Sequence, residues 1–384
     1  MISAFSFVDH LRGLGYSQYA GVPCSFLTSL INYVIGDPTV DYIGATSEGE
    51  AVGVTFGAFL AGRKTVTMCQ NSGLGNMVNP LTSLNYPFRV PTLLIVTWRG
   101  QPEVRDEPQH EQMGRIMQRL LETMEIPYLP FPAGETEIAQ TLAEAEASMQ
   151  QRKRPFALVM QRGSVAPQAL SGRVETESLK TDLRQNLSAK ETDQLTRTAA
   201  IELILDALAG DEAIIATTGK TGRELFTISD RANHLYVVGG MGTASAIGFG
   251  VAHALPRQPV VVIDGDGAAL MKLGVLATIG FYQPSNLLHI ILDNQAHDST
   301  GGQQTASQIV RFAAIADASN YRSAFAVDRP KDIQEAVRLL RYRRGPSLLH
   351  VKIRSGSPAK LGRPTVPPHE VKERFSQFLR SNAK

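Results

Sequence analysis

The sequence has few cysteines, no excess of one charge and no long apolar run. Cys24 and Cys69 are its only cysteines in 384 residues; they are too few for a disulfide scaffold, and their spacing matches no zinc or redox motif. The 38 Lys and Arg against 36 Asp and Glu leave a net charge of +2, which argues against a nucleic-acid-coating surface. No run approaches the roughly 18 apolar residues that span a bilayer, and Asp9 and Arg12 interrupt any signal peptide. We therefore expect a cytoplasmic protein without membrane or nucleic-acid partners.

Strand-like apolar runs alternate with segments long enough for helices along both halves of the chain. In the first half the runs are 41–46, 65–69, 91–97 and 155–160, and in the second they are 213–217, 235–238, 259–263, 287–292 and 347–353. This alternation is typical of parallel sheets covered by helices. Hydrophobic residues at 43% and charged residues at 19% are ordinary for folded domains.

The stretch 168–196 between the two halves is polar and has no long regular pattern. Polar stretches of this kind commonly connect domains. We predict an α/β protein with two doubly wound parallel-sheet domains, residues 1–167 and 197–384, joined by the linker 168–196.

Two neighbouring strand-like runs of the second half end in oxygen-bearing side chains. The run 259–263 leads into Asp264-Gly265-Asp266-Gly267, and the run 287–292 leads into Asp293-Asn294. Because the carboxyl ends of parallel strands line the ligand crevice, Asp266 and Asn294 can offer oxygens to one Mg²⁺. The glycines let the backbone approach a phosphate. Asp-Gly and Asp-Asn also end strands as ordinary turns, but the combination favours a magnesium and phosphate site.

A Gly-Asp-Gly sequence followed at this distance by a strand-terminal Asn resembles the fingerprint of thiamine-diphosphate (ThDP) enzymes. The resemblance implies that the metal is held by Asp266, Asn294 and the carbonyl of Ala296 and bridges the diphosphate. It implies further cofactor-binding roles for Thr218, Gly219, Met241, Gly242, Gly265, Gly267 and Ala268. Met241 would lie under the bent cofactor, although a core methionine is an equally good account of that residue.

ThDP enzymes also need a carboxyl group that hydrogen-bonds the aminopyrimidine ring, and Glu48 and Glu50 compete for this role. In the superfamily this Glu precedes a helix glycine by nine positions, and Gly57 lies nine after Glu48, so we choose Glu48. Taken alone, Glu48 is an ordinary carboxylate at a helix N-terminus.

The resemblance makes 1–167 the pyrimidine-binding domain and 197–384 the diphosphate-binding domain, with no room for the middle domain that many ThDP enzymes carry. The cofactor lies between these domains of two chains in the superfamily, so the resemblance implies at least a homodimer.

Four loops resemble the phosphonopyruvate decarboxylase family more closely. They are QNSGLGN at 70–76, WRGQP through DEPQH at 98–110, TTGKTGRE at 217–224 and AHDSTGGQ at 296–303. The resemblance implies ThDP- and Mg²⁺-dependent decarboxylation of 3-phosphonopyruvate to phosphonoacetaldehyde and CO₂, in phosphonate and antibiotic biosynthesis. The chain departs from the family pattern at Glu103, Ala268, Gln295 and Gln304, none of which is a metal ligand.

A substrate with a carboxylate, a ketone and a phosphonate needs cations and N–H donors around it. The substrate-binding candidates are Asn71, Ser72, Arg99, Lys220 and Arg223, and Arg105 also lies in one of the loops. Taken singly, each cation is an ordinary surface charge. His110, His297 and Asp298 are candidates for the catalytic proton transfer, whereas His289 and His350 lie inside strand-like runs and are expected to pack.

Three other functions stay open from the sequence. A sulfopyruvate decarboxylase would keep the cofactor and change the substrate. The segment 240–245, GMGTAS, follows a strand-like run and partly imitates a dinucleotide-binding fingerprint, so a nucleotide-dependent dehydrogenase is a second alternative. A non-catalytic assembly protein on an old enzyme fold is the third, although the presence of Glu48, Asp266 and Asn294 argues against it.

Overall fold

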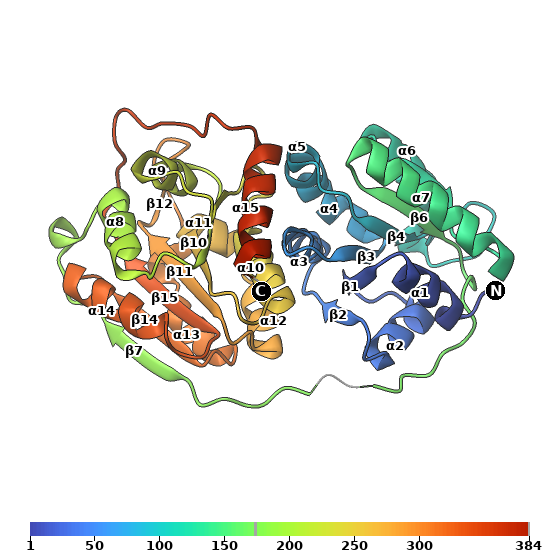
Figure 1. Ribbon diagram of the computed structural model, residues 1–384, viewed down its shortest axis with the longest axis horizontal. Helices are drawn as coiled ribbons and strands as arrows, with labels where there is room; N and C mark the ends of the chain where they lie inside the picture. The colour runs from blue at the N-terminus through green and yellow to red at the C-terminus, as the bar shows by residue number, and fades with distance from the viewer. Residues whose placement is uncertain (173–174, 383–384) are drawn as a thin grey trace. The chain divides into compact units, whose positions relative to one another are not determined.

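The structure is a computed structural model that describes residues 1–172 and 175–382. Its contacts divide the chain into two compact units, Met1–Glu175 and Thr176–Lys384 (Figure 1). The division falls inside the stretch 168–196 expected as a linker, and the described residues form no third unit. Within the same residues, no helix is long and apolar enough to cross a membrane.

The N-terminal unit contains one six-stranded parallel sheet in the order β2-β1-β3-β4-β6-β5. Its strands are β1 Tyr16–Gly21, β2 Asp41–Gly44, β3 Lys64–Gln70, β4 Leu93–Thr97, β5 Tyr128–Pro130 and β6 Phe156–Met160. Its helices are α1 Ala4–Gly13, α2 Thr28–Gly36, α3 Glu48–Leu60, α4 Leu74–Pro80, α5 Tyr86–Phe88, α6 Glu111–Thr123 and α7 Ile138–Arg152. Two apolar cores result: α1, α2 and α7 pack in one, and α3, α4 and α6 in the other.

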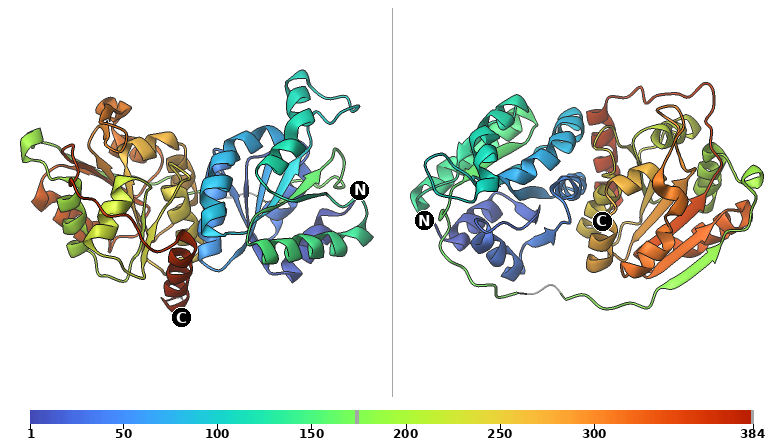
Figure 2. Two further views of the ribbon diagram at one scale, coloured as in Figure 1. Left: turned by 90° about the horizontal axis from the view of Figure 1, so that it is seen from above. Right: turned by 180° about the vertical axis from the view of Figure 1, so that it is seen from behind.

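The C-terminal unit contains a seven-stranded parallel sheet in the order β7-β14-β15-β11-β10-β8-β9. Its strands are β7 Asp182–Asn186, β8 Ala213–Ala216, β9 His234–Tyr236, β10 Val260–Gly265, β11 Leu287–Asp293, β14 Ser323–Val327 and β15 Ser347–Lys352, and β12 Ala296–His297 pairs with β13 Gln303–Gln304 in a separate ribbon. Its helices are α8 Arg197–Ala207, α9 Lys220–Ile228, α10 Ala244–Ala254, α11 Asp266–Met271, α12 Val275–Tyr282, α13 Phe312–Ala318, α14 Pro330–Leu340 and α15 Pro368–Asn382. Figure 2 shows the helices of each unit from two further directions.

The two predicted parallel-sheet domains are present, but four strands of the parallel sheets were not predicted: β1, β5, β7 and β14. Strand β7 lies inside the expected linker and pairs with β14 at the edge of the C-terminal sheet. Its sequence DLRQN is polar and four of its five residues are exposed, so it carries none of the apolar alternation that indicates a strand. Only its backbone pairing with β14 makes it one.

The strand order of each sheet has a switch point, where consecutive connections run to opposite sides of one strand. The switch points determine where the polar loops lie. In the C-terminal unit the chain passes from β8 to β9 on one side and then to β10 on the other. In the N-terminal unit it passes from β1 to β2 on one side and then to β3 on the other. Loops that leave the carboxyl ends of strands at such a switch point diverge and open a crevice. A ligand-binding site is therefore expected at these two edges.

Candidate active site

A cavity in the C-terminal unit lies at the carboxyl ends of β8, β10 and β11. The loops 217–221, 265–268 and 296–299 line it together with Leu292, Asn294 and Arg197. The structure thus brings together eleven of the predicted residues: Thr218, Gly219, Lys220, Gly265, Asp266, Gly267, Ala268, Asn294, Ala296, His297 and Asp298. Arg197, the first residue of α8, also lines the cavity and was not predicted.

Two buried aspartates at this edge have opposite electrostatic surroundings. Asp293 accepts hydrogen bonds from His350 Nε2 at 2.8 Å and Lys352 Nζ at 2.6 Å; although burial opposes them, these two bonds lower its pKa. Asp266 is 3% exposed, and burial raises its pKa with help from the charge of Asp293. Among the described residues no Lys, Arg or His forms an ion pair with Asp266, so no cationic side chain in that part of the chain balances this carboxylate.

The Asp266 carboxylate is held in place by hydroxyl groups. Thr305 Oγ1 and Ser307 Oγ both donate to Asp266 Oδ2, the latter at 2.9 Å. Ser307 Oγ also lies 2.7 Å from Asp293 Oδ1. These contacts fix the orientation of the carboxylate without neutralising it.

Asn294 is oriented by its neighbours as well. Its Nδ2 donates to Asp298 Oδ2 at 2.7 Å, and its Oδ1 accepts from the backbone N–H of Ala296 at 3.3 Å. The predicted metal-binding set is therefore one carboxylate, one amide oxygen and one backbone carbonyl, all oxygen donors, which suits Mg²⁺.

The backbone around the cavity leaves space for a phosphate. Gly219 has φ 93° and precedes α9; the Gly222 N–H donates to the Thr217 carbonyl, which leaves the N–H groups of Lys220 and Thr221 at the helix start for an anion. A Cβ added at Gly267 would lie 2.6 Å from His297 Cε1. Glycine is therefore required at position 267 for His297 to lie where it does.

Two predicted residues lie beside the cavity and one lies away from it. A Cβ added at Gly242 would come within 2.9 Å of the Ala268 carbonyl, so the loop 239–243 packs against the lining. Met241 in that loop is 50% exposed, unlike the core methionine that was the alternative. The Arg223 guanidinium donates to the carbonyls of Leu361 and Gly362 at 2.6 and 2.9 Å, and the structure does not bring it into this cavity.

In the N-terminal unit Glu48 is the first residue of α3 and is partly buried. Its Oε2 accepts from Asn76 Nδ2 at 2.8 Å. Gly73 lies directly against it, since a Cβ at that position would be 2.3 Å from Glu48 Oε1. The QNSGLGN segment therefore supplies both a partner and the space for the predicted catalytic acid.

Glu50 has a structural task instead. It is 1% exposed, its backbone N–H donates to Ser47 Oγ, and its carboxylate accepts from the backbone N–H and the hydroxyl of Thr46. These reciprocal bonds resemble a capping box at the start of α3. They explain the presence of this second acid without catalysis and favour Glu48 for the chemical role.

Arg99 is fixed at the end of β4. Its Nε and Nη2 both donate to the Asp106 carboxylate, at 2.7 and 2.5 Å, and its Nη1 donates to Ser25 Oγ at 3.1 Å. The bond from Arg99, opposed by burial, holds the pKa of Asp106 well below its usual range. The guanidinium stacks over the Phe26 ring at 4.7 Å, which leaves it rigid at the sheet edge.

A cavity beside Arg99 contains two more arginines. It is lined by Ser25, Phe26, Arg99, Arg105, Asp106, Glu107 and Arg162. Arg105 and Arg162 are exposed, and neither forms an ion pair with any residue that the structure describes. Arg162 was not predicted; its position just after β6 was the available signal.

The other predicted residues of this edge lie nearby in the fold. Asn71 is fully buried; its Nδ2 donates to the Arg99 carbonyl at 2.7 Å, and its Oδ1 finds no hydrogen-bond partner among the described residues. Ser72 is exposed and accepts from Gln70 at 2.6 Å. His110 is 7% exposed at the start of α6, and its Nδ1 is likewise without a partner within the described ranges.

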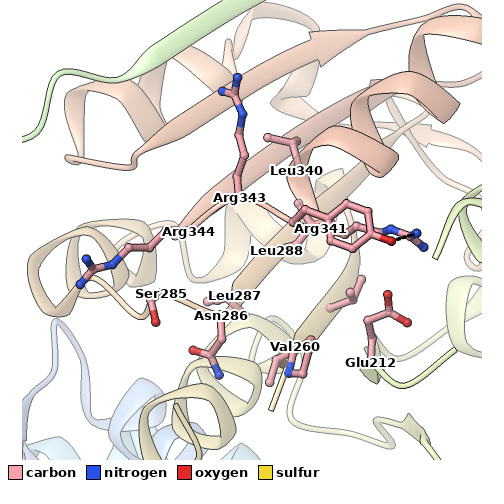
Figure 3. A pocket seen from close by; sticks show the side chains of 13 residues that line it. Glu212, Val260, Ser285, Asn286, Leu287, Leu288, Leu340, Arg341, Arg343 and Arg344 are labelled. Atoms are coloured by element: carbon pink, nitrogen blue, oxygen red, sulfur yellow. Dashed lines mark hydrogen bonds between the residues drawn. The ribbon is translucent and has the colours of Figure 1, made fainter. Parts of the chain in front are cut away.

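The strand histidines pack in the C-terminal core, as predicted. His350 donates to Asp293, and His289 lies 3.5 Å from Asp264 with 1% exposure. A further cavity lies at the opposite edge of that sheet, around the first residues of β10 and β11 (Figure 3). It contains Arg341, Arg343 and Arg344, and no predicted site residue lines it.

The chain matches two known domains in order. Residues 3–120 match the thiamine pyrophosphate enzyme N-terminal TPP binding domain, and residues 218–351 match the corresponding C-terminal TPP binding domain. The solved benzoylformate decarboxylase of Polynucleobacter necessarius superposes with a TM-score of 0.71 at 12% identity, over 92% of this chain and 99% of that one. Fold and site together define a thiamine pyrophosphate enzyme, TPP being a synonym of ThDP.

Full-length relatives narrow the family. The chain is 45% identical to the phosphonopyruvate decarboxylase of Streptomyces viridochromogenes, over 99% of this chain and 95% of the relative. It is 44% identical to the phosphonopyruvate decarboxylase of Streptomyces hygroscopicus, over 98% of this chain and 94% of the relative. The sulfopyruvate decarboxylase of Methanosarcina acetivorans is 30% identical over 97% and 96%. The chain belongs to the phosphonopyruvate decarboxylase family.

Proposed function

We propose that the chain catalyses the ThDP- and Mg²⁺-dependent decarboxylation of 3-phosphonopyruvate to phosphonoacetaldehyde and CO₂. The observation that carries the substrate is the identity of 44–45% to two phosphonopyruvate decarboxylases against 30% to a sulfopyruvate decarboxylase of similar coverage. The reaction fits phosphonate and antibiotic biosynthesis in the cytoplasm.

The diphosphate end of the cofactor would bind in the C-terminal cavity. Asp266, Asn294 and the Ala296 carbonyl would hold Mg²⁺, while Gly219 and Lys220 at the start of α9 would meet the phosphate oxygens. Asp266 supports this assignment most directly, because it is a buried acid with a raised pKa and no cationic partner in the described part of the chain. When bound, ThDP supplies a thiazolium that accepts the electrons released as CO₂ leaves.

Glu48 would hydrogen-bond the aminopyrimidine ring and move its proton. Asn76 keeps the carboxylate at the start of α3. Because the two units each carry one half of the predicted cofactor site, and the family resemblance implies cofactors shared by two chains, we propose a homodimer or a larger homo-oligomer.

The phosphonate would bind in the arginine cavity of the N-terminal unit. Near neutral pH a phosphonate carries about one negative charge more than a sulfonate, since its second pKa lies near that of a phosphate ester. Arg105 and Arg162 form no ion pair with a described residue, and Arg99 offers a fixed donor set; with Asp106 and Glu107, the three arginines leave the lining with a net charge of +1. This count favours the more highly charged substrate.

Other predicted residues have narrower tasks. The free Asn71 Oδ1 and Ser72 hydroxyl can orient the carboxylate or ketone through water or hydrogen bonds, and His110 or His297 can carry the last proton to the product. Asp298 and Arg223 are already engaged with protein groups, so we propose that both act on neighbouring residues before they act on substrate.

The deciding experiment measures aldehyde formation from 3-phosphonopyruvate and from sulfopyruvate by the same enzyme. Chelator-treated protein should be inactive and should regain activity only when ThDP and Mg²⁺ are both returned. We expect kcat/KM to be at least 100-fold higher for 3-phosphonopyruvate. Faster turnover of sulfopyruvate would contradict the proposal. The chain would then be a sulfopyruvate decarboxylase, the alternative that the relative from Methanosarcina acetivorans supports.

A further inference from the structure

Arg197 sits in a nearly closed network of buried charges behind Asn294. Its Nη1 donates to Glu224 Oε1 at 2.9 Å and to Ser357 Oγ at 3.1 Å, and its Nη2 donates to Asp298 Oδ2 at 2.6 Å. The side chains of Arg197, Glu224 and Asp298 are 7%, 1% and 10% exposed. Such contacts in a nearly dry environment are strong and rigid.

The network continues from Asp298 to the predicted metal ligand. Asp298 Oδ2 accepts from both Arg197 and Asn294 Nδ2, the latter at 2.7 Å. An ionised carboxylate has no proton to donate, so it can face only the nitrogen of the Asn294 amide. The amide oxygen must then point the other way, where the Ala296 N–H reaches it. The position of the Asp298 carboxylate therefore sets which side of the Asn294 amide carries the nitrogen and which carries the oxygen.

Arg197 holds the Asp298 carboxylate in that place through its hydrogen bond to Oδ2. It is itself anchored from behind by Glu224, which also accepts from Thr198 Oγ1 at 2.8 Å and from Ser357 Oγ at 3.0 Å. Without the guanidinium, two buried carboxylates would face each other with no cation between them, and the arrangement would have to change.

We infer that Arg197 is a positioning residue for the metal: through Asp298 it sets the orientation of the Asn294 amide so that the oxygen and not the nitrogen faces the cation. It contacts neither substrate nor the reacting atoms in this role. One arginine against two carboxylates also leaves the network with a net charge of −1, which favours a cation next to it. This role depends on the metal site and not on which keto acid the enzyme decarboxylates.

The test measures metal affinity directly. Mn²⁺ binding to the full-length protein in saturating ThDP is followed by electron paramagnetic resonance, and Mg²⁺ is titrated in competition. In Arg197→Met we expect a 10- to 100-fold weaker affinity for both metals, the usual loss when a group that orients a metal ligand is removed. High Mg²⁺ should restore most of the ThDP binding, which a misfolded site would not allow.

Three further variants separate positioning from simple destabilisation. Arg197→Lys keeps the charge but can bind only one carboxylate at a time. Its loss of metal affinity should therefore be smaller than that of Arg197→Met. Asp298→Asn lets the Asn294 amide turn over and should weaken metal binding as much as Arg197→Met. The double variant should be no worse than Asp298→Asn alone, because both changes act through one contact.

Arg374→Met is the matched control. It removes another arginine of the same unit that pairs with a carboxylate, Asp230, and its metal affinity should equal that of the wild type. Wild-type affinity in folded Arg197→Met or Arg197→Lys, or additive losses in the double variant, would overturn the inference. A wild type that binds Mn²⁺ and ThDP but decarboxylates neither keto acid would overturn the proposed function and leave this inference standing.

Discussion

The two units have the same kind of sheet edge and arrange its polar groups differently. In the C-terminal unit Asp266, Asp293, Asn294 and Asp298 are all tied to protein partners, from Ser307 and Lys352 to Arg197. In the N-terminal unit Glu48 accepts a side-chain hydrogen bond from Asn76, and Arg105 and Arg162 are exposed beside a fixed Arg99. One edge is interlocked and the other is partly open.

The difference agrees with the ligands that we propose for each edge. A diphosphate and its metal carry charges that stay the same through a reaction, so a rigid set of oxygens binds them best. A catalytic acid that gains and loses a proton, and a cavity through which substrate and product pass, cannot be committed to protein partners. We therefore expect substitutions at the open edge of the N-terminal unit to change catalysis, those at the interlocked edge of the C-terminal unit to change metal binding, and those in the buried core of the C-terminal unit to change stability.

The largest effect should come from Glu48→Gln, which tests the open edge. The amide keeps the size of the side chain but cannot carry the proton, so we expect kcat to fall by about 10³-fold or more, given that general acid–base groups contribute about 10²- to 10⁴-fold. ThDP and Mg²⁺ affinity should stay within a few fold of the wild type. Steady-state kinetics and calorimetric titration measure the two.

Glu50→Gln is the matched control for that substitution. It weakens the cap of α3 and should reduce thermal stability by roughly 1 kcal/mol with little change in kcat. If Glu50→Gln abolished activity while Glu48→Gln retained it, the assignment of the two acids would be reversed.

The next effect should come from the exposed arginines. Arg105→Gln and Arg162→Gln each remove one charge from the cavity, and a charge-assisted hydrogen bond contributes about 1.5–3 kcal/mol. We expect KM for 3-phosphonopyruvate to rise roughly 10- to 100-fold with a smaller change in kcat, and KM for sulfopyruvate to rise less. An exposed arginine away from this cavity, Arg338→Gln, should alter neither constant; equal behaviour of all three variants would remove the cavity from substrate binding.

Lowering the pH should destabilise the C-terminal unit through His234, which is buried in its core. Burial lowers the pKa of this fully buried histidine from 6.5 to about 4. Between these pH values the unfolded chain binds a proton at this histidine that the native state does not bind. The free energy of unfolding therefore falls as the pH drops from 6.5 towards 4. His234→Phe should reduce the slope of the free energy of unfolding against pH by up to one proton, which is about 1.4 kcal/mol per pH unit. Urea unfolding at a series of pH values measures this slope.

The exposed His10→Phe serves as a control for this titration and should leave the slope unchanged. The pKa of Asp106 in the N-terminal unit is lowered instead, by its bonds from Arg99 against the effect of burial, so that pair contributes stability that survives throughout this window. A wild-type slope in His234→Phe would show that the histidine does not stay neutral in the native state.

The smallest effect should come from Gln295, next to the proposed metal ligand Asn294. It has φ 60°, and its N–H and C=O are fixed by Asp293 and Thr305. A non-glycine residue in this conformation costs roughly 1 kcal/mol, so Gln295→Gly should raise the free energy of unfolding by about 0.5–1 kcal/mol. Gln295→Ala should give no gain, because alanine bears the same strain; an equal gain in both would rule out the backbone as its source.

The sequence predicted the groups that local motifs define and missed those that only the fold brings near. Asp266, Asn294 and Ala296 follow strands at a recognisable spacing, and Glu48 follows a strand and opens a helix. Arg197 is separated from Asp298 by 101 positions, and no short motif connects them. The same limit applies to β7, whose polar residues join the sheet only because β14 offers an unpaired edge.

Residue roles were harder to predict than residue positions for a similar reason. Asp298 and Arg223 were both placed in plausible loops, yet their bonds lead to Asn294 and to the carbonyls of Leu361 and Gly362. Whether a charged side chain faces a ligand or a neighbour depends on tertiary partners that the sequence does not reveal.

Gly73 leaves the space that the side chain of Glu48, the proposed catalytic acid, occupies. No bond joins the two residues, yet a single methyl group at position 73 would overlap the Glu48 carboxylate. The geometry of this acid is thus encoded by a missing side chain, and evolution could silence the enzyme there without touching a reactive group. A sequence with intact Glu48, Asp266 and Asn294 but a larger residue at position 73 should accordingly be regarded as a candidate pseudoenzyme.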